Sequence, residues 1–285
     1  MNQCLMYGSN LSWPASLSCE FHKTSAGGTA LAEVQHSGPL RVQKLFHDRD
    51  LAHCYVLHPP GGMVSGDDLH CRFHVHPDAR ILVTTPAAGK LYRSRSNESL
   101  QIAATTVQVD DGGICAYLPQ DTIVFNGSNG KLETNVSLSS SASYFGWEHT
   151  IFGRSAGALP FVSGQLSQCL TISRDHKLLY RDRLQIDAEV LNSGSGLCGM
   201  TSLASCILIL PAEAQGSDEL VETCRLSLKG FEGISGVTAI RDGLISIRLL
   251  SSLSEDTRTA LERLWSAVGE FLMARKVETP RIWRT

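Results

Sequence analysis

The distribution of apolar residues divides the chain into a long β-rich part and a shorter C-terminal part. From residue 29 to about residue 209, short runs rich in β-branched and aromatic residues alternate with turn residues, a pattern typical of an all-β architecture. Gly and Asn in the turns supply positive φ angles, and Pro withholds a backbone donor. The clearest predicted strands cover residues 41–45, 54–57, 81–85, 100–109, 122–125, 131–138 and 184–190. We therefore predict a mainly β fold of layered or β-helix-like sheets made of many short strands.

The C-terminal quarter has a different periodicity. A predicted helix starts with Ser217 as its N-cap and stops at Gly230, and it places apolar residues on one face. Residues 237–240 and 244–250 then predict a β-hairpin whose turn contains Gly243.

A second predicted helix follows the hairpin, because Ser252 and Glu255 have the spacing of a capping box. Its apolar residues recur at helical intervals and are Leu261, Leu264, Trp265, Val268, Phe271 and Leu272. Such a stripe more often covers a sheet of its own chain than a partner, although the partner interface remains an alternative. We expect one domain over residues 1–285, with a β-rich body at about 20–212 and a helix–hairpin–helix part at about 213–285.

Composition narrows the class of protein. A formal net charge of −3 gives no basic face for nucleic acid. The N-terminus has no secretory pattern and no run of about 18 apolar residues occurs, so we expect a cytoplasmic protein without a membrane span. Nine cysteines without a CxxC pair favour small buried side chains over a zinc cluster.

The segment GSGLCG at residues 194–199 matches the glycine pattern of dinucleotide-binding proteins. The apolar run that follows it ends at Pro211 and is more typical of a buried strand than of a helix. Without a helix N-terminus there is no dipole to hold a pyrophosphate, so we reject this interpretation. The chain contains no P-loop, no GxSxG and no HExxH motif.

Residues 66–76, GDDLHCRFHVH, are rich in potential metal ligands. If they form a strand, His70, His74 and His76 share one face, and imidazole suits nickel, copper and zinc. Residues four apart on a strand are about 13 Å apart, too far for one ion, so His70 is a poor ligand. His74 and His76 remain candidates, with Asp67 and Asp68 upstream as weaker oxygen ligands. This segment is the basis of an alternative function, a metal-dependent hydrolase.

Several charged residues lie in apolar or turn settings. Buried charge is costly unless it is paired, so these residues predict either internal salt bridges or a polar passage, with pairing the more common use. They are Lys90, Glu148, Arg154, Arg181 and Asp182.

The order of several motifs resembles one known family along nearly the whole chain. They are GPLRVQKLFH from Gly38, HPPGGMVSGDDL from His58, ARILVTTPAAGKLYRS from Ala79, YLPQDTIVFNGS from Tyr117, the WE and GR pairs at residues 147–148 and 153–154, and PRIWRT from Pro280. With these gaps, PPGGxxxGD followed by TTxxAxKxYRS and LPQxTIxF is specific. The chain resembles the urease accessory protein UreD family, called UreH in some bacteria.

The resemblance implies a scaffold that is not an enzyme. It implies binding to the helical accessory protein UreF, through it to the nickel GTPase UreG, and to apo-urease, in a dimer of heterocomplexes. It also implies no tightly bound cofactor, but transient Ni(II) moving through a water-filled internal passage.

The family motifs carry over to particular residues. Asp67 is the first candidate for a nickel-passage carboxylate, with Asp68 and Glu148 next, beside the histidines 74 and 76. The motif residues expected to form structural polar contacts are Lys90, Tyr92, Arg93 and Arg154, together with Arg181 and Asp182. The chain departs from the family pattern at Pro86, Gly89 and Ala116, which removes any polar lining that these positions would supply.

Overall fold

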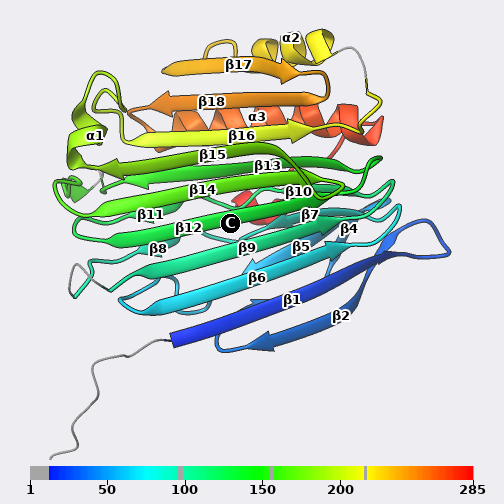
Figure 1. The fold of residues 1–285 in the computed structure, drawn as a ribbon, viewed down its shortest axis with the longest axis horizontal. Coiled ribbons are helices and arrows are strands. Elements are labelled where there is room, and N and C mark those ends of the chain that lie inside the picture. The colour runs from blue at the N-terminus through cyan, green and yellow to red at the C-terminus, as the bar shows by residue number, and fades with distance from the viewer. Residues whose placement is uncertain (1–12, 96–98, 155–156, 215–216, 285) are drawn as a thin grey trace, which may run out of the picture.

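Two mixed β-sheets lie face to face, and the larger one carries helices on its other side (Figure 1). The computed structural model describes residues 13–95, 99–154, 157–214 and 217–284. Mainly apolar side chains fill the space between the sheets, and a second apolar core lies between the larger sheet and the helices. The predicted mainly β fold is confirmed.

The smaller sheet has seven strands in the order β15-β14-β12-β9-β6-β1-β2. Its five central strands run parallel to one another, whereas β2 and β15 pair antiparallel at the two edges. Its strands are β1 (Trp13–Lys23), β2 (Thr29–Ser37), β6 (Asp67–Val75), β9 (Gln101–Val109), β12 (Asn129–Leu138), β14 (Gln165–Arg174) and β15 (Lys177–Asp187).

The larger sheet has eleven strands among the described residues, with the main order β17-β18-β16-β13-β10-β7-β5-β3. Its long strands are β5 (Leu51–Leu57), β7 (Arg80–Thr84), β13 (Ser143–Phe152), β16 (Ser202–Ile209), β17 (Ile234–Arg241) and β18 (Leu244–Ser251). Its short strands are β3 (Arg41–Val42), β4 (Phe46–Asp48), β8 (Gly89–Leu91), β10 (Ile114–Tyr117) and β11 (Thr122–Val124). The C-terminal hairpin β17–β18 therefore extends the sheet formed by the β-rich body.

The middle of the chain winds between the two sheets. Along this part of the chain the strands alternate between the sheets, with β6, β9, β12 and β14 in the smaller sheet and β7, β10 and β13 in the larger one. A parallel pair needs a crossover connection, and here a strand of the opposite sheet supplies it. This winding is the β-helix-like arrangement predicted from the short strands.

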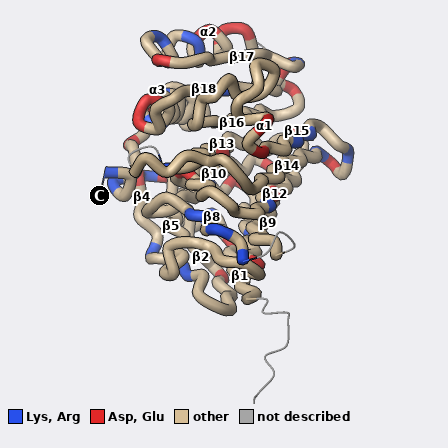
Figure 2. The backbone as a smooth tube through the Cα atoms, turned by 90° about the vertical axis from the view of Figure 1, so that its left-hand side faces the viewer, with Lys and Arg blue, Asp and Glu red and all other residues tan. Residues whose placement is uncertain are grey.

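The two long helices are α2 (Ser217–Ser227) and α3 (Ser254–Met273), and both lie in the C-terminal quarter as predicted. In the rotated view, α3 lies beyond the larger sheet, on the side away from the smaller sheet (Figure 2). Leu264 and Trp265 of α3 are fully buried against β13, β16 and β18. The apolar stripe therefore covers a sheet of its own chain, although Phe271, also assigned to it, is exposed. None of the helices in the described ranges is long and apolar enough to cross a bilayer.

Two local predictions at element boundaries are wrong. The predicted strand at 184–190 ends at Asp187, whose carboxylate accepts hydrogen bonds from the N–H groups of Glu189 and Val190 and caps the short helix α1 (Ala188–Asn192). The predicted capping box at Ser252 does not form, because Leu253 is the N-cap of α3 and makes no side-chain cap bond. Neighbouring Ser251 instead uses its hydroxyl to bond the backbone of Leu253.

Other local predictions are confirmed. Helix α2 starts at Ser217 as predicted, but Ser217 is its first residue and not its N-cap, and its hydroxyl accepts a hydrogen bond from the backbone N–H of Gly243 in the hairpin turn. Gly243 has a φ of +72°, which suits glycine at that turn. The glycine-rich segment 194–199 leads into the buried strand β16 and not into a helix, which agrees with the rejection of a dinucleotide site.

Candidate functional site

Strand β13 lies in the middle of the molecule with protein on both faces. Its side chains alternate, so Phe145 and Trp147 point toward the helices, whereas Tyr144 and Phe152 point toward the smaller sheet. Glu148 shares the face of Tyr144 and Phe152. The alternation therefore places a carboxylate between the two sheets, where the other neighbours are mostly apolar.

A cavity of about 240 Å³ lies between the sheets beside Glu148. At its inner end it is lined by buried or half-buried side chains, among them Phe73, Tyr117 and Thr134. At its outer end it is lined by the partly exposed segments 61–62 and 85–90. The cavity thus connects the interior carboxylate with a loop-lined rim.

Two residues of the smaller sheet form hydrogen bonds with Glu148 of the larger sheet. Thr134 donates its hydroxyl proton to one carboxylate oxygen at 2.5 Å, and the Gln168 amide donates to the other. Burial raises the pKa of Glu148, and these two hydrogen bonds act in the opposite direction. Glu148 retains some accessible surface although protein surrounds it, because it faces the cavity. The carboxylate is therefore open to water or to a small ion.

Further polar groups line the same cavity. Burial raises the pKa of Tyr117, whose hydroxyl lies 3.1 Å from that of Thr105. Burial lowers the pKa of His58 at the rim, and the nearby negative charge of Asp67 acts in the opposite direction. Both groups are thus held neutral and offer oxygen or nitrogen ligands without extra charge.

The two aspartates of the GDDL segment lie at the start of β6 and outside the cavity lining. Asp67 accepts a hydrogen bond from the N–H of Val64 at 2.8 Å and so closes a turn. Asp68 pairs with His70 at 2.8 Å. Asp67 is near the rim through its interaction with His58, whereas the structure does not bring Asp68 to Glu148.

The candidates His74 and His76 lie at the opposite end of β6 from these aspartates. The side chains of His70, His74 and His76 share one face of this strand segment. That face points away from the inter-sheet core that holds Phe73 and Val75. His74 and His76 meet two residues that the sequence did not indicate, Asp110 and Glu20. The segment 67–76 therefore does not form a single site with both aspartates and both histidines, as the alternative hydrolase would need.

The polar motif residues have varied environments. Asp182 forms an ion pair with Arg248 of β18, while its neighbour Arg181 is exposed. The ring of Tyr92 packs on Phe125 with centroids 5.3 Å apart. Lys90 lines the cavity rim, and none of the described acidic groups pairs with it within 4 Å.

Two arginines of the family motifs make packing or backbone contacts. The aliphatic part of Arg93 lies against Gly127, where an added Cβ would come within 2.9 Å of it. Arg154 is exposed and its backbone N–H donates to the carbonyl of Leu159.

The three departures from the family pattern occupy different places. Pro86 and Gly89 line the cavity rim, so their lack of polar side chains makes that rim less polar. Ala116 belongs to the core between the larger sheet and the helices. An acid at position 116 would point away from the cavity, so its absence does not alter the lining.

The cysteines in the described ranges are mainly buried, as expected from their spacing. Burial raises the pKa of Cys71, which lines the cavity, to about 12. A protonated thiol is a poor metal ligand, so oxygen and nitrogen donors dominate the chemistry of this cavity.

Comparison with known proteins gives a consistent result. A family model described as UreD urease accessory protein matches residues 14–284. The urease accessory protein UreD of Marinomonas sp. (strain MWYL1) is 34% identical over 283 residues, covering 96% of this chain and 90% of that protein. UreD of Methylobacillus flagellatus is 34% identical and covers 96% of this chain and 95% of its own length. UreD of Janthinobacterium sp. (strain Marseille) is 37% identical, with shares of 91% and 88%. These relatives are named as accessory proteins and not as enzymes.

Proposed function

This chain belongs to the UreD family of urease accessory proteins, and from that premise we propose that it guides Ni(II) through the cavity between its sheets during urease maturation. Its role in urease maturation follows from the family. The passage of the ion through the cavity is the more specific part of the proposal, and one observation supports it. That observation is the carboxylate of Glu148, which is surrounded by protein and faces a cavity with a loop-lined rim.

The chemistry of the cavity suits an ion in transit. Ni(II) binds imidazole and carboxylate ligands, and a carrier must hold it loosely enough to release it. The lining offers the carboxylate of Glu148 together with hydroxyl, phenol and imidazole groups, and it also includes Lys90 and Glu133, whose carboxylate pairs with Lys131. A dication near Glu148 would favour its ionised form, so the ion and the carboxylate support each other at this position.

The rim near His58 is the proposed outer end of the path. Asp67 lies close enough to oppose the effect of burial on the pKa of His58. An acidic group at a rim attracts cations, and the buried carboxylate of Glu148 then provides the next ligand. Asp68, His74 and His76, the other candidates from the sequence, lie outside the cavity lining and are not part of this proposed path.

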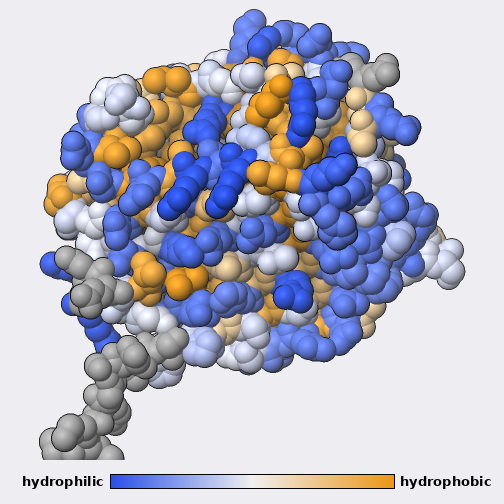
Figure 3. Space-filling view, viewed as in Figure 1, coloured by the Kyte–Doolittle hydropathy of each residue, from blue (hydrophilic) through white to orange (hydrophobic). Residues whose placement is uncertain are grey.

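The proposed partners are the helical accessory protein UreF, the GTPase UreG held through UreF, and apo-urease, in a dimer of heterocomplexes in the cytoplasm. In support, apolar residues gather on the surface over β15, β17 and β18 (Figure 3). Leu178, Ile234 and Ile240 are each about half exposed or more there. Groups of exposed apolar residues are a common feature of protein interfaces.

The test replaces Glu148 with Gln, which has nearly the same shape and no charge. We expect Glu148→Gln to lower the nickel content and activity of urease matured in its presence by about tenfold, because one buried charged ligand is lost. Co-purification with UreF and apo-urease should be unchanged, because the side chain is interior. The measurement is nickel per urease active site after maturation with purified components.

The matched control is Glu189→Gln, which removes an exposed carboxylate of α1 that does not line the cavity. It should mature urease like the wild type. Normal nickel loading with Glu148→Gln would contradict the cavity path, and loss of the complex would show that the effect is structural.

A further inference from the structure

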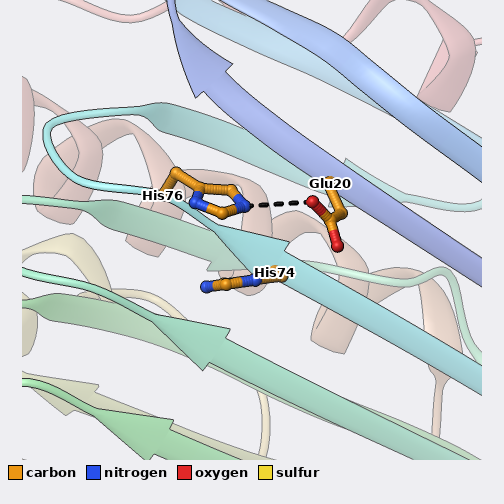
Figure 4. Close-up of side chains that lie close together, drawn as sticks. All are labelled: Glu20, His74 and His76. Carbon is orange, nitrogen blue, oxygen red and sulfur yellow. Dashed lines mark hydrogen bonds and ion pairs between the residues drawn. The ribbon is translucent and has the colours of Figure 1, made fainter.

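A second group of metal-binding side chains lies on the outer face of the smaller sheet. Glu20 of β1 is directly opposite His74 of β6 in the parallel register, and Asp110 follows the end of β9. His76 follows the end of β6. The cluster therefore forms where the carboxyl ends of three neighbouring parallel strands meet, and Figure 4 shows three of its side chains side by side.

The distances within this cluster are short. His76 Nε2 donates to Glu20 Oε2 at 3.2 Å, and His74 Nε2 donates to Asp110 Oδ2 at 2.8 Å. The imidazole rings of His74 and His76 have centroids 3.9 Å apart, and His22 stacks on His76 at 3.6 Å. One ligand atom from each of Glu20, His74 and His76 can be chosen so that all lie within 4.8 Å of one another.

This spacing is close to that of a metal site. Ligand atoms bound to one ion at about 2.1 Å lie about 3 to 4 Å apart, so atoms within 4.8 Å of one another need only small movements to bind the same ion. His74 and His76 are each 22% exposed and Glu20 is 39% exposed, so side-chain rotation can supply that change without moving the strands.

We propose that Glu20, His74 and His76 form a surface site for one divalent transition-metal ion of the Ni(II), Cu(II) or Zn(II) class, with Asp110 orienting the imidazoles. A set of two imidazoles and a carboxylate binds such ions in preference to Mg(II) or Ca(II). None of these four residues lines the inter-sheet cavity. The site is therefore separate from the passage proposed above and does not depend on it.

The hydrogen bonds already present support this assignment. A metal-binding histidine usually donates its second ring N–H to a carboxylate, which fixes its tautomer. Asp110 accepts from His74 Nε2 and leaves Nδ1 of the neutral ring as the free lone pair. His76 Nδ1 lies 3.9 Å from the same carboxylate. A shift of the His76 proton from Nε2 to Nδ1 frees Nε2 for the ion with no net change in protonation.

The surroundings leave the site open to solvent. A polar surface depression beside it is lined by Glu20, Glu33, Arg72, His74 and Gln108 among others. Arg72 is exposed, so solvent screens its positive charge, and the carboxylate of Glu33 lines the same depression. The outer face is mainly hydrophilic toward this end of β1, β6 and β9 (Figure 3).

The test measures metal binding to the untagged full-length chain by equilibrium dialysis against Ni(II) and, separately, Zn(II), with Mg(II) as the hard-cation reference. We expect the double variant His74→Ala/His76→Ala to lose one bound equivalent of Ni(II) or Zn(II). We expect Glu20→Gln to weaken that equivalent at least about tenfold and Asp110→Asn to weaken it about 10- to 100-fold. Bound Co(II) should also lose its visible absorption bands in the double variant.

The matched control is His70→Ala, which removes an exposed histidine from the same strand and face but outside the cluster. It should bind metal like the wild type. Glu148→Gln should also keep this equivalent, which separates the surface site from the cavity. Equal binding by wild type, Glu20→Gln and the double variant would overturn the proposal. The same holds if Ni(II) and Zn(II) raise the Tm of wild type and double variant equally.

Discussion

At the scale of single residues, the same side-chain type has different chemistry in different surroundings. His74 and His76 lie on the surface among carboxylates, whereas His53 and His149 are buried in the larger sheet. Burial lowers the pKa of His53 to about 4 and that of His149 to about 4, because a buried imidazolium loses its hydration. His149 bonds Ser202 at 2.9 Å, but Nε2 of His53 has no hydrogen-bond partner among the described residues.

The lowered pKa values of His53 and His149 in the folded chain predict a loss of stability in acid. The unfolded chain takes up these protons near pH 6.5, whereas the folded chain does so only near pH 4, so the free energy of unfolding falls as the pH drops through that window. We expect His53→Leu to remove about 1 to 2 kcal/mol of the loss between pH 6.5 and pH 5. Urea unfolding of both proteins at the two pH values measures it. An unchanged difference between the two pH values would contradict the burial argument.

At the scale of elements, α3 connects the larger sheet with the C-terminal segment. Its buried face packs on three strands, and Trp265 Nε1 donates to the carbonyl of Glu278 at 3.4 Å beyond the helix end. Further along, Trp283 is buried and its Nε1 donates to the hydroxyl of Thr84 at 2.8 Å. The closing PRIWRT motif thus attaches the C-terminal segment to β7, whose residue Thr84 also lines the cavity.

Removing the largest buried side chain of α3 tests this packing. We expect Trp265→Ala to lower the free energy of unfolding by about 3 to 5 kcal/mol, through lost burial and the cavity that it creates. Phe271→Ala on the same helix removes a ring that is 52% exposed, so it should cost less than about 1 kcal/mol. Chemical denaturation of both variants makes the comparison, and similar losses would show that α3 does not pack as described.

At the scale of the whole molecule, Arg275 joins parts of the chain that are 225 residues apart. It follows the C-cap of α3 and bonds Asp48 Oδ2 at 3.1 Å and Asp50 Oδ1 at 2.9 Å, at the turn between β4 and β5. Burial raises the pKa of Asp50, but the hydrogen bond and charge of Arg275, with the charge of Arg80, outweigh it and leave that pKa lowered. These contacts hold the C-terminal segment against the larger sheet.

Breaking this ion pair should therefore act over a long range. We expect Arg275→Gln to cost about 3 kcal/mol of stability, because Asp48 loses its ion-pair partner and Asp50 keeps only Arg80. It should also speed hydrogen exchange in residues 275–284 and in 46–51. Arg284→Gln, an exposed arginine of the same segment, is the control and should change neither quantity. Faster exchange in only one of the two segments would argue against a direct link.

The sequence by itself determined the local structure of this protein and its family. Alternation and helical periodicity follow from backbone geometry, so the mainly β fold, the hairpin around Gly243 and the buried stripe of α3 were predictable from neighbouring residues. The ends of elements were less predictable, because a single carboxylate at Asp187 was enough to replace the end of a strand by a helix.

Only the tertiary structure decided where the chemistry lies. Glu148 faces a cavity because β13 is covered on both sides, and its hydrogen-bond partners come from two strands of the opposite sheet. Glu20 meets His76 across 56 residues of sequence, and Asp110 meets His74 across 36, through the register of three parallel strands. Periodicity along one segment carries no information about which strands pair or how they align, so neither site could be assembled from sequence spacing.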